Sequence, residues 1–324
     1  MNDSAGPGDD SLRRTFMALR DEIGKVIVGQ DGLVTGLLTA ALANGHVLLE
    51  GVPGVAKTLT VKTFAAALDL ESARVQFTPD LLPADVTGQL ILDPASRQFE
   101  YRPGPVFTNV LLADELNRTP PKTQAALLEA MEERQVTVDG RPRPLPDPFL
   151  VIGTQNPVEY EGTYPLPEAQ MDRFLFNLRV GYPAPDDEVQ VLRRHHEGLD
   201  PHDIRAAGVQ AVAGPEDLAA ARSAVNRVGV QDRVLSYIVN LANASRSAAD
   251  VDLGLSPRGS TALLRAAKAW AWLSGRAYVT PDEVKAVAKP VLRHRLLLGS
   301  AHVPDLLDAD PVIDRLLTTV AVPR

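Results

Sequence analysis

Apolar and polar positions alternate in two different ways along this chain. Between about residues 13 and 183, short apolar runs of strand length are separated by segments whose apolar residues recur at helical spacing. This alternation predicts an α/β core, a five-stranded parallel sheet with helices on both faces and the ligand at the carboxyl ends of the strands. The predicted strands are His46–Glu50, Arg74–Thr78, Asn109–Glu115, Phe149–Gln155 and Phe174–Val180, and the predicted helices are Leu12–Gly24, Gly32–Asn44, Lys57–Leu70 and Lys122–Arg134.

Two segments interrupt this alternation with the period of two residues that is typical of paired strands. An insert at about 87–107 contains Gln89–Arg102, in which two apolar runs flank a polar turn. A second hairpin is predicted at about 134–148, where Gln135–Val138 precedes an Asp139-Gly140 turn. Each hairpin is either a surface decoration or a projection that contacts a partner or lines a central pore.

After about residue 184 the pattern changes to Ala-rich helices without strands. Prolines at positions 215, 257 and 281, each preceded by a residue that can cap a helix, indicate helix starts. We therefore expect a linker and an all-α domain over 184–324, and a disordered acidic tail over 1–12. The predicted helices are Asp186–Glu197, Pro215–Val228, Gln231–Ser245, Pro257–Ser274, Thr280–Leu297 and Asp310–Thr319.

A glycine-containing loop between the first strand and its following helix is the strongest chemical signal. In this context the backbone N–H groups and the positive end of the helix can surround a triphosphate, the Lys57 ammonium can neutralise its oxygens, and the Thr58 hydroxyl can reach Mg²⁺. The usual pattern has Gly before the Lys, whereas this chain has Ala56, so the loop must tolerate a Cβ there. For this segment alone, an ordinary strand-to-helix turn is the alternative. The candidate nucleotide-binding residues are Gly51, Val52, Pro53, Gly54, Val55, Ala56, Lys57, Thr58 and Leu59.

A later apolar strand ends in two carboxylates, Asp114 and Glu115. One carboxylate at such a strand end can coordinate or orient Mg²⁺ while the other polarises an attacking water. We therefore expect ATP and Mg²⁺ as cofactors, Thr58 and Asp114 on the metal side, and Glu115 as the general base. An Asp-Glu pair alone is common on protein surfaces, and it is the order of the two motifs that predicts nucleotide hydrolysis.

Composition narrows the remaining function classes. The chain has 324 residues, which predicts about two domains, and its 45% hydrophobic content is ordinary for a globular protein. It has no cysteine, which excludes disulfides, thiolate chemistry and zinc–cysteine sites. No apolar run approaches the roughly 18 residues of a membrane helix, so we expect no membrane insertion and a cytoplasmic protein. The net charge of −8 argues against nucleic acid as the main partner.

Five sequence blocks, in order, resemble the MoxR family of AAA+ ATPases. The resemblance runs from about residue 15 to the C-terminus, and it implies an AAA+ core with a helix-2 insert and a pre-sensor-1 hairpin, followed by an α-helical lid. Ala before the loop Lys is common in that family. The blocks are Gly51–Thr58, Phe77–Leu82, Asp114–Arg118, Gly153–Pro157 and Leu166–Phe174, and Ser256-Pro257-Arg258 follows in the helical domain.

The resemblance also implies roles for residues outside the two motifs. Asn156 would be sensor 1, which helps to place the attacking water, although an Asn-Pro turn is the alternative. Arg173 would be an arginine finger that reaches a nucleotide held by the neighbouring subunit, unless it forms only a surface pair with Asp172. Arg258 would be sensor 2, which couples nucleotide state to the angle between domains, unless it is an ordinary exposed arginine. A further segment, which resembles the one that lies against adenine, is Val28, Gly29 and Gln30.

Because an arginine finger would act on a neighbouring subunit, the resemblance also implies a homo-oligomeric ring, with a hexamer as the expected form. The family resembles chaperone-like ATPases that mature, assemble or activate other protein complexes, with a protein client and a von Willebrand A-domain partner. One alternative is a magnesium-chelatase-like subunit for metal insertion. Another is a nucleic-acid motor, which would need basic hairpins, but the first hairpin balances its Arg97 and Arg102 with Asp93 and Glu100.

Overall fold

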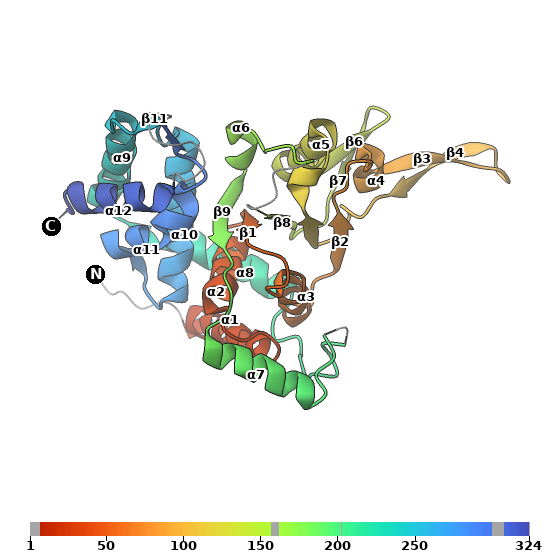
Figure 1. Ribbon diagram of the computed structural model, residues 1–324, viewed down its shortest axis with the longest axis horizontal. Helices are drawn as coiled ribbons and strands as arrows, with labels where there is room; N and C mark the ends of the chain where they lie inside the picture. Colours follow the sequence, from red (N-terminus) through yellow and green to blue (C-terminus); the bar gives the residue numbers. More distant parts are fainter. Residues whose placement is uncertain (1–6, 157–161, 202, 300–307, 324) are drawn as a thin grey trace.

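The computed structural model describes residues 7–156, 162–201, 203–299 and 308–323. At its centre lies one parallel sheet whose strand order is β2-β5-β8-β1-β9 (Figure 1). The sheet confirms the predicted α/β core and all five predicted strands. Their bounds are β1 His46–Glu50, β2 Ser72–Gln76, β5 Val110–Asp114, β8 Leu150–Gln155 and β9 Phe174–Arg179.

Helices cover both faces of the sheet, and alternate residues of the apolar strands show how. Val47 and Leu49 of β1 pack on the side of α1 (Pro7–Gly24), α2 (Asp31–Leu42) and α3 (Lys57–Ala67). Leu48 points the other way and packs with α5 (Pro121–Glu133). Because strand side chains alternate between faces, an unbroken apolar run such as β1 is what a doubly covered strand requires.

Both predicted hairpins form. The first pairs β3 (Gly88–Asp93) with β4 (Gln98–Pro103) after the short helix α4 (Pro83–Thr87), and it projects far from the body of the molecule (Figure 1). A Cβ on Gly88 would collide with the Arg102 carbonyl, so the base of this hairpin closes too tightly for any other residue. The second hairpin pairs β6 (Gln135–Val138) with β7 (Arg141–Pro144).

The second half of the chain is mainly helical, and α9 to α12 group at one end of the molecule (Figure 1). Two predicted caps are present: the Ser256 hydroxyl accepts a hydrogen bond from Gly259 N–H, and Thr280 forms a capping box with Glu283. No helix among the described residues is long and apolar enough to cross a bilayer. The helices are α7 Pro185–His196, α8 Pro215–Arg227, α9 Asp232–Ser247, α10 Pro257–Leu273, α11 Pro281–Leu292 and α12 Ala309–Thr319.

The expectation that this half lacks strands is wrong. Four short strands pair where loops run side by side: β10 (Gly229–Val230) with β12 (Tyr278–Val279), and β11 (Val251–Leu253) with β13 (Leu297–Leu298). Helix α11 accordingly ends at Leu292, five residues before its predicted end, because the chain turns there to reach β13.

The predicted disordered tail is also partly wrong, because α1 already begins at Pro7. Asp9 and Asp10 lie in its first turn, where carboxylates favour a helix start, and Asp9 accepts a hydrogen bond of 2.9 Å from Arg227 of α8. Further along, Phe16 packs edge to face on Trp272 of α10. Helix α1 therefore joins the core to the helical half. The rest of the expected tail, residues 1–6, lies outside the described part of the chain.

Candidate functional site

The loop between β1 and α3 adopts a left-handed turn just before the helix. Ala56 has φ +58° and ψ +20°, and Gly54 has φ +85°. A residue with a Cβ takes this conformation at a cost of about 1–2 kcal/mol. Ala56 can therefore replace the usual Gly, although its backbone is strained. Since Ala56 has no side chain that could cap α3, the first N–H groups of the helix remain available to an anion.

Lys57 lies within this loop. Its Nζ donates a hydrogen bond of 2.6 Å to the Gly51 carbonyl. Burial lowers the pKa of the ammonium group, while the nearby carboxylates of Asp114 and Glu115 oppose that change. A phosphate group would give the half-buried ammonium the close anionic partner that favours its charged form.

A cavity of about 710 Å³ opens over the loop at the carboxyl edge of the sheet. That volume suits a small-molecule ligand of nucleotide size. Of the predicted loop and adenine-segment residues, Gly29, Gly51 and Val52 do not line it. Gly51 has a structural role instead, because a Cβ at this position would collide with the carbonyl of Val180, which directly follows β9. The predicted residues that do line it are Val28, Gln30, Pro53, Gly54, Val55, Ala56, Lys57, Thr58, Leu59, Asp114, Glu115 and Asn156. Pro157, next to Asn156, lies outside the described residues.

One wall of this cavity comes from a segment that the sequence did not single out. The Gln30 amide donates to the Gly181 carbonyl, and the Arg194 guanidinium donates to the Gly24 and Lys25 carbonyls, which hold α7 against the α1–α2 connection. Helix α7 has no buried residue, so its pattern is that of a solvated surface helix and carries no signal of a binding role. The residues it and its flanks contribute are Tyr182, Pro183, Glu188, Val191, Arg194, His195, Leu199 and Pro201.

One hydroxyl contacts both acidic residues at the end of β5. The Thr154 hydroxyl of β8 donates to Asp114 Oδ1 at 2.6 Å, and the oxygen of that hydroxyl accepts the backbone N–H of Glu115 at 2.9 Å. Glu115 takes a left-handed backbone conformation with φ +56°. Its carboxylate accepts a 2.7 Å hydrogen bond from the Gln76 amide and forms a 3.1 Å ion pair with Arg118. Both carboxylates therefore lie at the cavity in fixed orientations.

The donor set fits the predicted metal. Thr58 supplies a hydroxyl and Asp114 a carboxylate, and both line the cavity beside Lys57. Mg²⁺ prefers oxygen donors and is usually bound by one or two protein groups together with substrate phosphates and water. The chain therefore offers what a magnesium–nucleotide complex needs from the protein.

Arg173 and Arg258 lie elsewhere, at the edge where the strands begin. Arg173 immediately precedes β9, whereas Lys57 follows the end of β1, and a five-residue strand spans about 16 Å. Both arginines line a second cavity of about 810 Å³ and neither lines the first. The prediction placed Arg258 among the nucleotide-binding residues. The structure instead brings it beside Arg173, because α10 and the segment after α11 dock at the edge where the strands begin.

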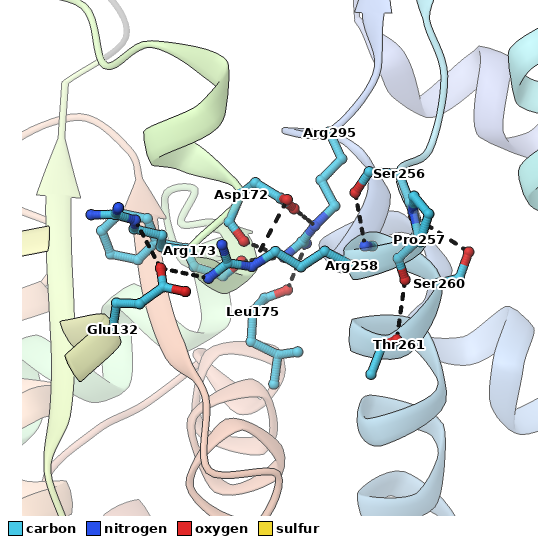
Figure 2. A network of polar contacts seen from close by, with 12 residues as sticks. Glu132, Asp172, Arg173, Leu175, Ser256, Pro257, Arg258, Ser260, Thr261 and Arg295 are labelled. Atoms are coloured by element: carbon cyan, nitrogen blue, oxygen red, sulfur yellow. Dashed lines mark hydrogen bonds and ion pairs between the residues drawn. The ribbon is translucent and has the colours of Figure 1, made fainter. Parts of the chain in front are cut away.

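Glu132 of α5 holds both arginines (Figure 2). Its Oε2 accepts a hydrogen bond of 2.9 Å from Arg258 Nη2 and lies 3.0 Å from Arg173 Nε. That Arg173 nitrogen is not aligned for a hydrogen bond, so the contact is an ion pair only. The predicted alternative, a pair between Arg173 and Asp172, does not form, because Asp172 instead bonds Arg295 at 2.6 Å.

Arg295 anchors the helical half to the core. Its guanidinium donates to the Asp172 carboxylate and to the carbonyls of Asp172, Phe174 and Leu175, next to Arg173 (Figure 2). Burial lowers the pKa of Arg295 to about 10, although Asp172 opposes that change.

The second cavity, which Arg173 and Arg258 line, is strongly basic in a chain of net charge −8. Its charged lining consists of Arg134, Arg173, Arg222, Arg258, Arg265, Lys268 and Arg295 against Glu132, Asp147 and Asp172.

Comparison with known proteins agrees with this geometry. The profile of the ATPase family associated with various cellular activities (AAA) matches residues 46–176, and that of the AAA lid domain matches residues 243–315. A crystal structure of a candidate ATPase from Cytophaga hutchinsonii superposes with a TM-score of 0.90 at 40% identity, covering 98% of this chain and 97% of that one. The fold is thus that of an AAA+ ATPase with a lid domain.

Full-length relatives identify the family. The uncharacterized protein YeaC of Bacillus subtilis is 48% identical, over 94% of this chain and 93% of its own. Chaperone MoxR1 of Mycobacterium tuberculosis is 45% identical over 94% of this chain and 81% of its own. The 38 kDa magnesium-chelatase subunit of Acidiphilium rubrum is more distant, at 28% identity over 83% of this chain. The chain belongs to the MoxR family of AAA+ ATPases.

Proposed function

We propose that the protein hydrolyses ATP with Mg²⁺ at a site shared between two copies of the chain, and that hydrolysis drives the remodelling of partner proteins. The observation that carries this proposal is the separation of Lys57 from Arg173 and Arg258 by the length of the sheet. Arginines at the opposite edge cannot reach the nucleotide of their own chain. A second copy can bring its arginines to it.

Within one protomer, the residues of the first cavity divide the work. Lys57 and the N–H groups at the start of α3 hold the phosphates. Thr58 and Asp114 would hold Mg²⁺, which would supply positive charge against the negative charge of the phosphates. Glu115 accepts a proton from the water whose oxygen attacks the γ-phosphorus, while Asn156 helps to place that water. The bond from the γ-phosphorus to the bridging oxygen breaks, which leaves ADP and phosphate.

The neighbouring protomer completes the site. Arg173 exchanges its ion pair with Glu132 for the γ-phosphate, where such an arginine contributes on the order of 10³–10⁵ in rate. Arg258 donates a hydrogen bond to the same Glu132 oxygen. We therefore assign Arg258 to the γ-phosphate that Arg173 contacts, which the neighbouring protomer holds, and not to the nucleotide of its own chain. A contact that joins one edge of a protomer to the opposite edge of the next is heterologous, and such a contact forms a ring when the rotation between copies closes. We propose a closed ring of six protomers.

Protein clients are the proposed targets. The projecting β3–β4 hairpin carries Phe99 and Leu92, which pair across the strands and are 70% and 50% exposed, so the ring would present apolar side chains to a client. The 45% identity to a protein named Chaperone MoxR1 supports a chaperone-like role. The proposed partner is a von Willebrand A-domain protein, and the proposed compartment is the cytoplasm. A chelatase-like metal-insertion role remains the second candidate, and it rests on relatives of 28–31% identity.

The test is Mg²⁺-dependent ATP turnover per protomer across a protein dilution series, for wild type, Lys57→Ala and Arg173→Ala. We expect specific activity to rise with concentration and both variants to lose it. Only the Lys57 variant should also lose ATP binding in a thermal-shift assay. Wild-type activity that is independent of concentration, together with normal turnover by Arg173→Ala, would overturn the shared site.

A further inference from the structure

Arg74 of β2 contacts the carboxylate that is assigned to the metal. Its Nη2 and Nε both donate to Asp114 Oδ2, at 2.7 and 3.1 Å. The contact follows from the sheet, since β2 pairs with β5 in parallel register and Arg74 also lines the nucleotide cavity. The other Asp114 oxygen accepts the Thr154 hydroxyl. Both oxygens of this carboxylate are therefore occupied by protein donors.

A magnesium ion and Arg74 would compete for the same oxygen. Mg²⁺ must engage Asp114 directly or through a bound water. A guanidinium at 2.7 Å from Oδ2 repels a dication at that position and offsets the charge that attracts it. Arg74 thus acts on Asp114 as a counter-ion whose effect is opposite to that of the metal.

Arg74 also contacts the second carboxylate indirectly. Its Nη2 donates to Gln76 Oε1 at 2.9 Å, and Gln76 in turn donates from Nε2 to Glu115 at 2.7 Å. Because the amide oxygen faces Arg74, the amide NH₂ group faces Glu115. One guanidinium therefore orients both the metal-side carboxylate and, through Gln76, the general base.

We propose that Arg74 is a positioning residue that serves as the counter-ion of Asp114 in the metal-free site and sets the affinity of the site for a divalent cation. This inference rests on the proposed ATP hydrolysis. The competing interpretation is an ordinary surface ion pair, since the Arg74 side chain is 49% exposed and such pairs contribute little. An ordinary pair would leave Mg²⁺ affinity unchanged.

The experiment measures binding of the β,γ-imido analogue of ATP by isothermal titration, in EDTA and across a Mg²⁺ series, without turnover. Arg74→Gln removes a positive charge, so the analogue alone should bind several-fold more weakly. The Mg²⁺ concentration for half-saturation should fall, by up to about tenfold for a unit charge about 6 Å from a dication in a water-like dielectric. Opposite shifts in the two affinities distinguish a counter-ion from a residue that only supports the fold.

Arg118 provides the matched control, because it is 40% exposed and pairs with Glu115 instead of Asp114. Arg118→Gln should change the Mg²⁺ half-saturation less than twofold, and Arg74→Lys, which keeps the charge, should stay close to wild type. An unchanged half-saturation in Arg74→Gln, or an equal shift in both glutamine variants, would overturn the inference. If the wild type itself bound the analogue equally well with and without Mg²⁺, the proposed function would fail instead.

Discussion

Glu132 competes with the phosphate that Arg173 and Arg258 are proposed to meet, and its removal gives a quantitative test. In the isolated protomer one Glu132 oxygen serves both arginines. Both contacts must break before the arginines reach a neighbour's nucleotide. Glu132→Gln keeps the shape of the side chain but removes its charge, so nucleotide-dependent assembly should need less protein.

The size of the effect follows from exposure. Glu132 is 36% exposed, and the two arginines are 29% and 48% exposed, so solvent screens both pairs. Each such pair contributes about 0.2–1 kcal/mol. Loss of both corresponds to about 0.4–2 kcal/mol, which is about a two- to thirtyfold change in an association constant. The concentration for half-maximal specific activity should fall by that factor.

The assay is turnover per protomer against protein concentration, with sedimentation velocity in the β,γ-imido analogue as a readout that needs no hydrolysis. The control is Glu133→Gln, which removes the same charge from the neighbouring, exposed position at the end of α5. If the protein concentration for half-maximal specific activity is unchanged or rises in Glu132→Gln, Glu132 does not compete with the phosphate. It would then orient Arg173 and Arg258 for their contact with the neighbour.

Three further outcomes are expected. Glu115→Gln should keep ATP bound but stop turnover, and steady-state hydrolysis near the wild-type rate would remove Glu115 as the base. Arg295→Leu should lower the free energy of unfolding by about 3–5 kcal/mol, because it leaves the Asp172 carboxylate beside buried carbonyls without its donor; urea denaturation measures this. Burial and Arg134 lower the pKa of His46 to about 3, below its value of about 6.5 in the unfolded chain. The neutral imidazole therefore stabilises the fold fully above pH 6.5, and this contribution is lost as the pH falls from 6.5 toward 3. Between pH 7 and pH 5.5, the free energy of unfolding should fall by about 1 kcal/mol less in His46→Gln than in the wild type. Equal falls in the two proteins would show that His46 does not cause this pH dependence.

The parts of the site that could be predicted are those whose residues are neighbours in the sequence. The phosphate loop follows its strand directly, and Asp114 and Glu115 end another, so strand length and motif order locate both at one edge of the sheet. The chemistry of these residues then follows from their types. The same holds for the hairpins, whose alternation and turns are local signals.

The parts that could not be predicted depend on contacts between distant segments. Arg74, Gln76 and Thr154 reach the carboxylates only because β2 and β8 flank β5, an order that periodicity does not reveal. The position of Arg258 depends on where the helical half docks, which Arg295 determines through contacts with Asp172 and Phe174. The early start of α1 likewise involves Asp9 meeting Arg227, more than two hundred residues away.

The separation of Lys57 from Arg173 across the sheet has a genetic consequence. On the proposed arrangement, a chain defective at Lys57 still carries intact arginines, and a chain defective at Arg173 still carries an intact phosphate loop. Mixed in equal amounts, two inactive variants would rebuild about a quarter of the interfaces with both halves sound, whereas a chain that carries both defects would inactivate two interfaces for each copy it contributes. Single-site mutations at opposite edges of the sheet would therefore complement one another, whereas two mutations at the same edge would not.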